Sequence, residues 1–385
     1  MHKTKPLCFT SAALAALALS CSDGFAQQAL SPMEALGEAL FHDENLSLNR
    51  SQSCASCHDP EAGFSDPRRS AEGAFSLGDD GSSLGNRNAP TASYASFIPA
   101  FHQAEDGDWV GGLFWDGRAA DLAEQAGGPP LNPIEMGLPN KAMLVQRLQE
   151  DPSYVQRFDA LFAAGVLEEA EHGFTAMTQA IAAFERSAVF APFDSKYDRY
   201  LAGKEEFTKE EELGRTLFFS EQFTNCNQCH QLRSSPMGAQ ETFSDYSFHN
   251  IGVPRNPAVV QEAGMAADFV DDGLLANPKV NDPAQRGKFR TPTLRNVAVT
   301  SPYMHNGVFQ NLRTVVLFYN QFNSKAEAAR INPETQEIWG APPVPGTLSV
   351  KELTHGPALD DRRMDALVAF LRTLTDQRHE HMLDD

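Results

Sequence analysis

The sequence is short of positive charge and of long apolar runs. Its 385 residues carry 31 Lys and Arg against 51 Asp and Glu, which gives a formal net charge of −20. This charge excludes nucleic acid and anionic membrane surfaces as binding partners, because both are themselves negative, and it favours a cationic partner. No apolar run approaches the roughly 20 residues that a transmembrane helix needs, so we expect no membrane span.

One shorter apolar run, residues 12–19, follows a basic start and precedes small residues that end at Ala26. This arrangement is typical of a secretory signal peptide. We expect residues 1–26 to be removed and the mature chain to reach the periplasm. A lipid-modified Cys21 is the competing interpretation, although Ala18 stands where a lipoprotein signal prefers Leu.

Cysteine is scarce, and four of the six cysteines form two C-x-x-C-H motifs, while Cys8 and Cys21 lie in the expected signal peptide. Two thiols three positions apart can add across the two vinyl groups of one porphyrin, and the adjacent His then reaches the iron. A thioredoxin-like redox pair does not require that His, and a four-cysteine zinc site leaves both histidines unexplained. We therefore predict two covalent c-type haems, bound by Cys54, Cys57 and His58 and by Cys226, Cys229 and His230.

The two motifs belong to an internal repeat. Residues 36–41 (LGEALF) and 213–218 (LGRTLF) share a helical register, and each segment precedes its motif by a short polar loop. Ser31 and Pro32 are typical of a helix start before the first segment, and Thr208 with Glu211 predicts a capping box before the second.

Helical periodicity also marks residues 141–149, 176–190, 314–322 and 361–373. No segment shows the alternation of a strand, and the long stretches 59–112 and 231–311 are rich in Gly, Pro, Asn and Asp. Loops of this length need a group to pack against, and a bound haem would provide the missing core. We predict a mainly α fold of two cytochrome-c-like haem domains with long wrapping loops, spanning residues 27–200 and 201–385.

Four segments resemble the bacterial dihaem cytochrome c peroxidase superfamily: residues 114–119 (FWDGRA), 132–137 (NPIEMG), 292–297 (PTLRNV) and 302–307 (PYMHNG). Within it, three segments resemble the MauG-type enzymes of methylamine utilisation: residues 190–198 (FAPFDSKYD), 249–252 (HNIG) and 317–320 (LFYN). The resemblance covers residues 30 to 378. In that group, oxidising equivalents from hydrogen peroxide complete a tryptophan tryptophylquinone cofactor inside a precursor of methylamine dehydrogenase. The resemblance thus implies that this chain is a peroxide-dependent enzyme that oxidises tryptophan residues of a partner protein.

The resemblance implies that the first haem, in the N-terminal domain, is high-spin and open to peroxide. Ordinary dihaem peroxidases carry a blocking His in the loop after the first motif. Here the first His after His58 is His102, well beyond that position, and we interpret it as a loop side chain. Peroxide cleavage also needs a proton shuttle and a polar group. The resemblance places these roles on Glu135 and Gln125.

The second haem is implied to be low-spin, with Tyr319 as its sixth ligand. Met304, His305 and Tyr319 are the candidates, and in ordinary dihaem peroxidases a Met aligns with Tyr319. A phenolate is a hard anionic donor that favours high oxidation states. Without the resemblance, Tyr319 reads as an amphipathic side chain on a helix.

The resemblance assigns two further features to the region between the haems. Trp115 would relay charge, although a Trp is ordinarily a core aromatic. A calcium ion would be bound by the side chain of Asn88 and the backbone carbonyls of Thr300 and Pro302, the oxygen donors that a hard cation prefers.

One position departs from the MauG pattern. Thr224 stands where those enzymes have a surface Trp through which charge leaves for the partner protein. We expect the nearby Phe223 and Phe243 to be exposed, but neither is a good carrier of charge.

The departure keeps other functions open. The chain could be a peroxide-detoxifying cytochrome c peroxidase fed by a small redox protein, or could oxidise another protein's Trp as in methanobactin biosynthesis. A pure electron carrier is the remaining alternative, against which the unblocked first haem argues.

Overall fold

A computed structural model describes residues 29–67, 74–224, 226–231 and 240–384. The signal peptide predicted for residues 1–26 lies outside the described residues. Within them, no helix combines the length and apolar character needed to cross a membrane. The prediction of a mainly α fold is confirmed, since the strands of the described chain are two residues long and form two antiparallel pairs. These pairs are β1 (His102–Gln103) with β2 (Trp109–Val110) and β3 (Phe248–His249) with β4 (Phe289–Arg290).

The α-helices of the described chain are α1 (Pro32–Phe41), α2 (Cys54–Cys57), α3 (Leu122–Ala126), α4 (Lys141–Gln149), α5 (Pro152–Leu161), α6 (Ala170–Glu185), α7 (Lys196–Leu201), α8 (Lys209–Phe218), α9 (Pro257–Glu262), α10 (Leu312–Asn320), α11 (Val350–Leu353) and α12 (Asp361–Arg372). Both predicted helix starts are confirmed: Ser31 caps α1, and Thr208 with Glu211 forms the capping box of α8. Helix α6 begins and ends earlier than predicted, and α5 was not predicted.

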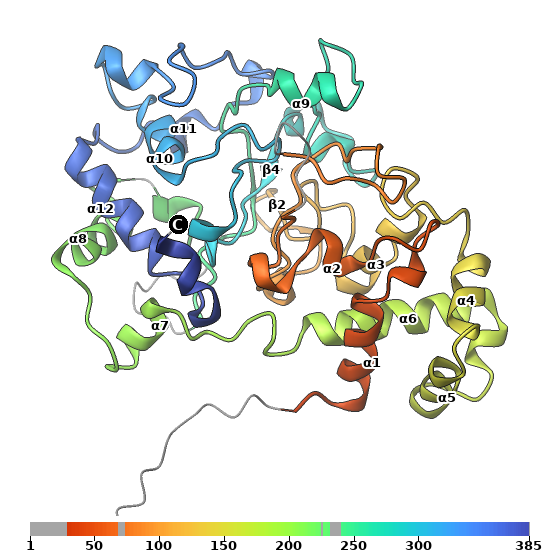
Figure 1. Cartoon of the computed structure of the whole chain (residues 1–385). Coiled ribbons are helices and arrows are strands. Elements are labelled where there is room, and N and C mark those ends of the chain that lie inside the picture. Colours follow the sequence, from red (N-terminus) through yellow and green to blue (C-terminus); the bar gives the residue numbers. More distant parts are fainter. Residues whose placement is uncertain (1–28, 68–73, 225, 232–239, 385) are drawn as a thin grey trace, which may run out of the picture.

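Two helix crossings organise the molecule, α1 with α6 and α8 with α12, and they lie on opposite sides of it (Figure 1). In each crossing the glycine of the repeat touches the partner helix backbone. A Cβ atom at Gly37 would lie 2.0 Å from the Ala180 carbonyl oxygen, and one at Gly214 would lie 1.8 Å from that of Ala366. Only glycine permits this approach, which explains why the repeat keeps its Leu-Gly pair.

The repeat extends beyond the first helices into the loops. Leu113 bridges to Ala119, and Tyr303 bridges to Phe309. Each bridge encloses a loop with a positive φ angle at its first residue, Phe114 or Met304, and at a later glycine. Trp115 and His305 therefore hold equivalent places in the two halves, a relation that their different chemistry hides in the sequence.

Each crossing has its own hydrophobic core. The first core is built around α1, α4, α5 and α6 and includes Phe41, Phe158 and Phe184. The second is built around α7, α8 and α12 and includes Tyr197 and Phe370. The long loops of both halves meet between the two cores (Figure 1).

Candidate functional site

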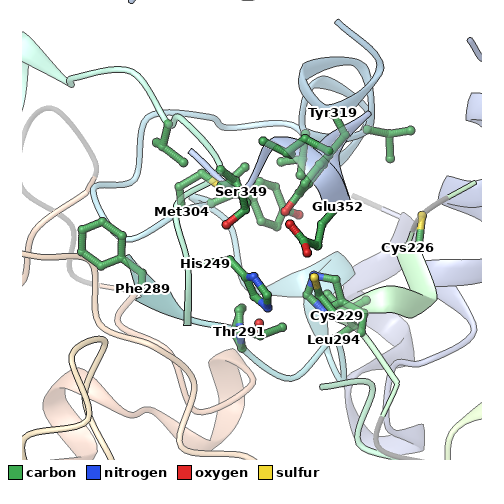
Figure 2. A pocket seen from close by; sticks show the side chains of 18 of the residues that line it. Cys226, Cys229, His249, Phe289, Thr291, Leu294, Met304, Tyr319, Ser349 and Glu352 are labelled. Atoms are coloured by element: carbon green, nitrogen blue, oxygen red, sulfur yellow. The ribbon is translucent and has the colours of Figure 1, made fainter. Parts of the chain in front are cut away.

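Each C-x-x-C-H motif lies on the wall of a large cavity. Cys54, Cys57 and His58 line a cavity of about 160 Å³, here called the first cavity. Cys226, Cys229 and His230 line one of about 240 Å³, the second cavity, part of which Figure 2 shows. No disulfide joins these four cysteines. Helix α2 holds both cysteines of the first motif, whereas in the second motif a 3₁₀ turn (Cys226–Gln228) holds Cys226 and is followed by Cys229.

The two motif histidines are held in the same way. His58 Nδ1 lies 3.2 Å from the Phe64 carbonyl oxygen, and His230 Nδ1 lies 3.1 Å from that of Phe243. An Nδ1–H that donates to a carbonyl leaves Nε2 unprotonated and available to a metal. Burial lowers the pKa of both histidines, which keeps the imidazoles neutral. Paired thiols and a neutral imidazole on the wall of a roomy cavity fit a c-type haem.

The first cavity also contains the polar residues predicted for peroxide chemistry. Gln125 on α3 and Glu135 both line it, beside Arg118. Burial raises the pKa of the Glu135 carboxyl, opposed by the charge of Arg118 and by a hydrogen bond from Asn132. Glu135 therefore keeps its proton to a higher pH than a surface glutamate.

His102 does not reach the first cavity. It is exposed on β1, with its Nδ1 2.8 Å from the Ala100 carbonyl oxygen. Among the residues that the structure describes, His58 is the only histidine lining the first cavity. The described chain thus offers no second histidine to an iron there.

All three candidate ligands of the second haem line the second cavity: Met304, His305 and Tyr319. Tyr319, on α10, and Glu352, on α11, point toward the part of the cavity that holds Cys229 (Figure 2). Burial and the neighbouring cysteines raise the pKa of Tyr319. Burial lowers the pKa of His305 to about 4, although Asp271 opposes this shift, and its ring stacks on Phe289 with centroids 3.6 Å apart.

Within the described chain, Trp115 and Arg290 are the only residues that line both cavities. The Trp115 indole Nε1–H donates to the Asn88 carbonyl oxygen at 2.8 Å. The backbone N–H of Arg290 donates to the Trp115 carbonyl oxygen at 2.9 Å. Trp115 therefore lies at the boundary between the two cavities.

Arg290 was not predicted from the sequence, where it precedes the segment 292–297 without any signal of its own. Of the arginines in the described lining, Arg87 and Arg118 pair with carboxylates, whereas Arg290 makes no ion pair. Its guanidinium donates to the carbonyls of Phe114 and Thr291, at 3.4 and 3.5 Å, and lies over the Tyr246 ring. Burial lowers its pKa to about 10, so it stays charged at neutral pH.

The residues expected to bind calcium are partly brought together. Asn88 Nδ2 lies 2.7 Å from the Pro302 carbonyl oxygen. The Thr300 hydroxyl donates to the Asn296 carbonyl oxygen. The Asn88 amide oxygen would face a cation beside Pro302 if the amide group were turned over, which exchanges the positions of its oxygen and nitrogen.

The surroundings of the second motif require one correction. Phe223 is exposed as expected, at 45% of its surface, but the expectation that Phe243 is exposed is wrong, because it is fully buried. Its ring packs edge-on against Tyr197 and Phe218, and its carbonyl is held beside His230. Thr224 is also buried, at 3% exposure, and its hydroxyl donates to the Leu217 carbonyl oxygen at 2.6 Å.

Comparison with known proteins also indicates a protein with two haem sites. A family model for di-haem cytochrome c peroxidase matches residues 31–206. The methylamine utilization protein MauG of Paracoccus denitrificans is 52% identical over 92% of this chain and 91% of its own length. Cytochrome c peroxidase Ccp of Escherichia coli is 35% identical over 71% of this chain and 50% of its own length. The crystal structure of the diheme peroxidase BthA from Burkholderia thailandensis aligns with a TM-score of 0.80 and 33% identity over 92% of this chain and 88% of its own.

The fold, the two motif-lined cavities and these similarities define a dihaem oxidoreductase. The chain belongs to the di-haem cytochrome c peroxidase family and, within it, to the MauG group.

Proposed function

We propose that this oxidoreductase uses hydrogen peroxide to oxidise tryptophan residues of a partner protein, as in the maturation of methylamine dehydrogenase. The observation that carries the proposal is the position of Trp115 on the walls of both cavities. Such a position lets one indole connect two haems, which suits an enzyme that shares two oxidising equivalents. The 52% identity to a methylamine utilization protein supports the same class of substrate.

Each haem is held in its own domain, with the division near residue 200. The first haem would be attached through Cys54 and Cys57 with His58 as an iron ligand, and the second through Cys226 and Cys229 with His230 as an iron ligand. The separate cores around the two helix crossings support this division, with Tyr197 of α7 already packed into the second core. When bound, the haems supply the irons that accept oxidising equivalents from peroxide.

The polar residues of the chain have distinct tasks in this proposal. Glu135 holds a proton on its buried carboxyl and delivers it to the departing peroxide oxygen, while Gln125 orients the peroxide. Tyr319 provides the anionic ligand of the second site. Calcium, bound by Asn88 with the carbonyls of Thr300 and Pro302, ties the loops of the two halves together.

The proposed location is the periplasm, after removal of residues 1–26. The net charge of −20 supports a partner with a cationic docking face, which applies equally to a protein substrate and to a small redox protein. The same charge argues against nucleic acid.

The direct test mixes the purified holoprotein with hydrogen peroxide and a methylamine dehydrogenase precursor. We expect the absorbance of the quinone to appear, and mass spectrometry to show the tryptophan cross-link in the precursor. The matched control is Trp115→Phe, which keeps the size of the aromatic side chain but cannot be oxidised at accessible potentials. Full consumption of peroxide without any change in the precursor would contradict the proposal.

Peroxide detoxification is the second candidate function. Two observations favour it: the alignment with a diheme peroxidase at a TM-score of 0.80, and the buried Thr224 at the position of the expected exit Trp. Rapid peroxide turnover with a reduced cytochrome c donor, without reaction of the precursor, would support this function instead.

A further inference from the structure

Glu185 is a buried acid that the proposed chemistry does not use. It is the last residue of α6, is 5% exposed and lines the first cavity. Within the described part of the chain, its Oε2 atom has no hydrogen-bond partner. A carboxyl group that is buried without partners is costly to the fold, which marks it as a candidate for a functional role.

The internal repeat shows what stands in the same place in the second half. Gly37 faces Ala180 and Phe184 on α6, whereas Gly214 faces Ala366 and Phe370 on α12. The residue after each phenylalanine is therefore equivalent, which pairs Glu185 with Leu371.

Both members of this pair line the cavity of their own half, Glu185 the first cavity and Leu371 the second. The two haem sites thus differ at one matched position, where the site expected to react with peroxide has an acid and the other has an apolar side chain.

Few charges act on Glu185. Arg186 follows it in the sequence and is exposed. The sulfur of Cys54 on α2 also lies close enough to interact with it, but a thioether to the proposed haem would carry no charge. Arg118 and Glu135 occupy other parts of the same lining.

The charged residues of the helices packed against α6 are exposed or already hydrogen-bonded. They are Glu34, which caps α1, Glu38 and Glu168, which are exposed, Glu124, which accepts from Ala120, Lys141, which pairs with Glu171, and Arg147, which donates to Asn45. The α1 residues buried at the crossing, including Leu36 and Leu40, are apolar. The environment therefore favours a neutral acid.

We propose that Glu185 is the proton-exchanging group of the first cavity, taking up one proton from solvent when the haem there gains an electron and releasing it when the electron leaves. The inference rests on the proposed function, because it requires a haem in this cavity. One electron and one proton enter together, so the buried region gains no net charge. At the matched position of the second cavity, Leu371 has no proton to exchange.

The direction in which the midpoint potential changes with pH follows from the linkage between protonation of Glu185 and reduction of the haem. Burial raises the pKa of Glu185 to about 8, opposed by Arg186. The extra positive charge of an oxidised haem lowers the pKa of a nearby carboxyl, and reduction removes that effect. The group is therefore more protonated in the reduced state across neutral pH. The midpoint potential of the first haem then falls as pH rises between the two pKa values, and it levels off outside them.

The test is a spectroelectrochemical titration of the holoprotein at a series of pH values, following the high-spin and low-spin signals separately. We expect the potential of the first haem to depend on pH through Glu185. Glu185→Gln and Glu185→Leu should abolish this dependence, and the reciprocal Leu371→Glu should create one at the second haem. Glu171→Gln is the matched control, because Glu171 also lies on α6 but is exposed and outside the cavity lining, and it should keep the dependence.

Two outcomes would overturn the inference: a pH-independent first haem in the wild type, or an unchanged dependence in Glu185→Gln. The wild-type titration needs no variant, so a misfolded Glu185→Leu does not weaken the test. Absence of two haem mass increments on the wild-type chain would instead refute the proposed function. Two haems with a pH dependence that survives Glu185→Gln would refute only the role of Glu185.

Discussion

The backbone N–H of Arg290 donates to the carbonyl oxygen of Trp115 at 2.9 Å, and both residues line both cavities. A matching bond runs between the halves in the other direction. In it the backbone N–H of Asn88 donates to the His305 carbonyl oxygen at 2.8 Å. Asn88 and Arg290 each lie two residues before a Pro-Thr pair, so the two halves exchange equivalent hydrogen bonds. The wall between the cavities is therefore fixed by backbone, and the Trp115 indole needs no rearrangement to face either side.

Trp115→Phe should separate charge sharing from haem binding. The ring stays apolar and the backbone bond from Arg290 remains, so we expect unchanged spectra for both haems. Sharing of oxidising equivalents should slow sharply, because Phe is not oxidised at accessible potentials. Stopped-flow spectroscopy after mixing with peroxide measures this rate. An unchanged rate would indicate that Trp115 is a core aromatic without a role in charge sharing.

Removing the charge of Arg290 should affect both haems together. A buried cation stabilises the reduced form of a nearby haem, and this guanidinium borders both cavities without a carboxylate partner in the described chain. Arg290→Gln should lower both midpoint potentials, and Arg290→Lys should restore most of the loss. Arg118→Gln is the control, since Arg118 lines only the first cavity and should affect the first haem alone. A change confined to one haem in Arg290→Gln would be inconsistent with a shared position.

The sequence was most informative where chemistry and local spacing coincide. The capping box at Thr208 and the helix Lys141–Gln149 depend on neighbouring residues, and the structure has both as predicted. Glu185 and Arg290 could not be found in this way, because their significance comes from cavities assembled by distant segments. Phe243 failed for a related reason: its burial is set by Tyr197, Phe218 and Phe370, which no local pattern reveals.

Replacement of Tyr319 tests the second haem site. The proposed wild-type arrangement predicts one high-spin and one low-spin ferric signal in electron paramagnetic resonance. Tyr319→His should keep the second haem low-spin, because imidazole is also a strong ligand. It should shorten the lifetime of the two-haem oxidised state, because the anionic donor is gone. Two low-spin signals in the wild type would contradict the open first site.

The close helix crossings predict that one added methyl group lowers the stability of the protein strongly. Gly37→Ala places a Cβ atom 2.0 Å from the Ala180 carbonyl oxygen, so α1 and α6 must move apart. We expect a loss of about 3 kcal/mol in the free energy of unfolding, measured by thermal denaturation of the holoprotein. Gly346→Ala is the control, since a Cβ atom there meets nothing within 4 Å. Equal stability of the two variants would show that the crossing can adjust freely.

The last prediction concerns the route by which charge leaves for the partner. A Trp at position 224 would have to enter a buried site and would remove the hydroxyl that bonds Leu217, so Thr224→Trp should destabilise the protein by about 2 kcal/mol. Phe223 is the better place, because it is exposed and precedes the second motif by only a few residues. If the chain acts on a methylamine dehydrogenase precursor, Phe223→Trp should accelerate quinone formation, because an exposed indole is far more easily oxidised than a phenyl ring.

Peroxide consumption at the first haem should stay unchanged in this variant, since the substituted position belongs to the other half. Leu48→Trp places an equally exposed indole in the N-terminal half and should not accelerate the reaction. If the wild type and Phe223→Trp form the quinone at the same rate, charge does not leave through this surface, and the docking face lies elsewhere on the molecule.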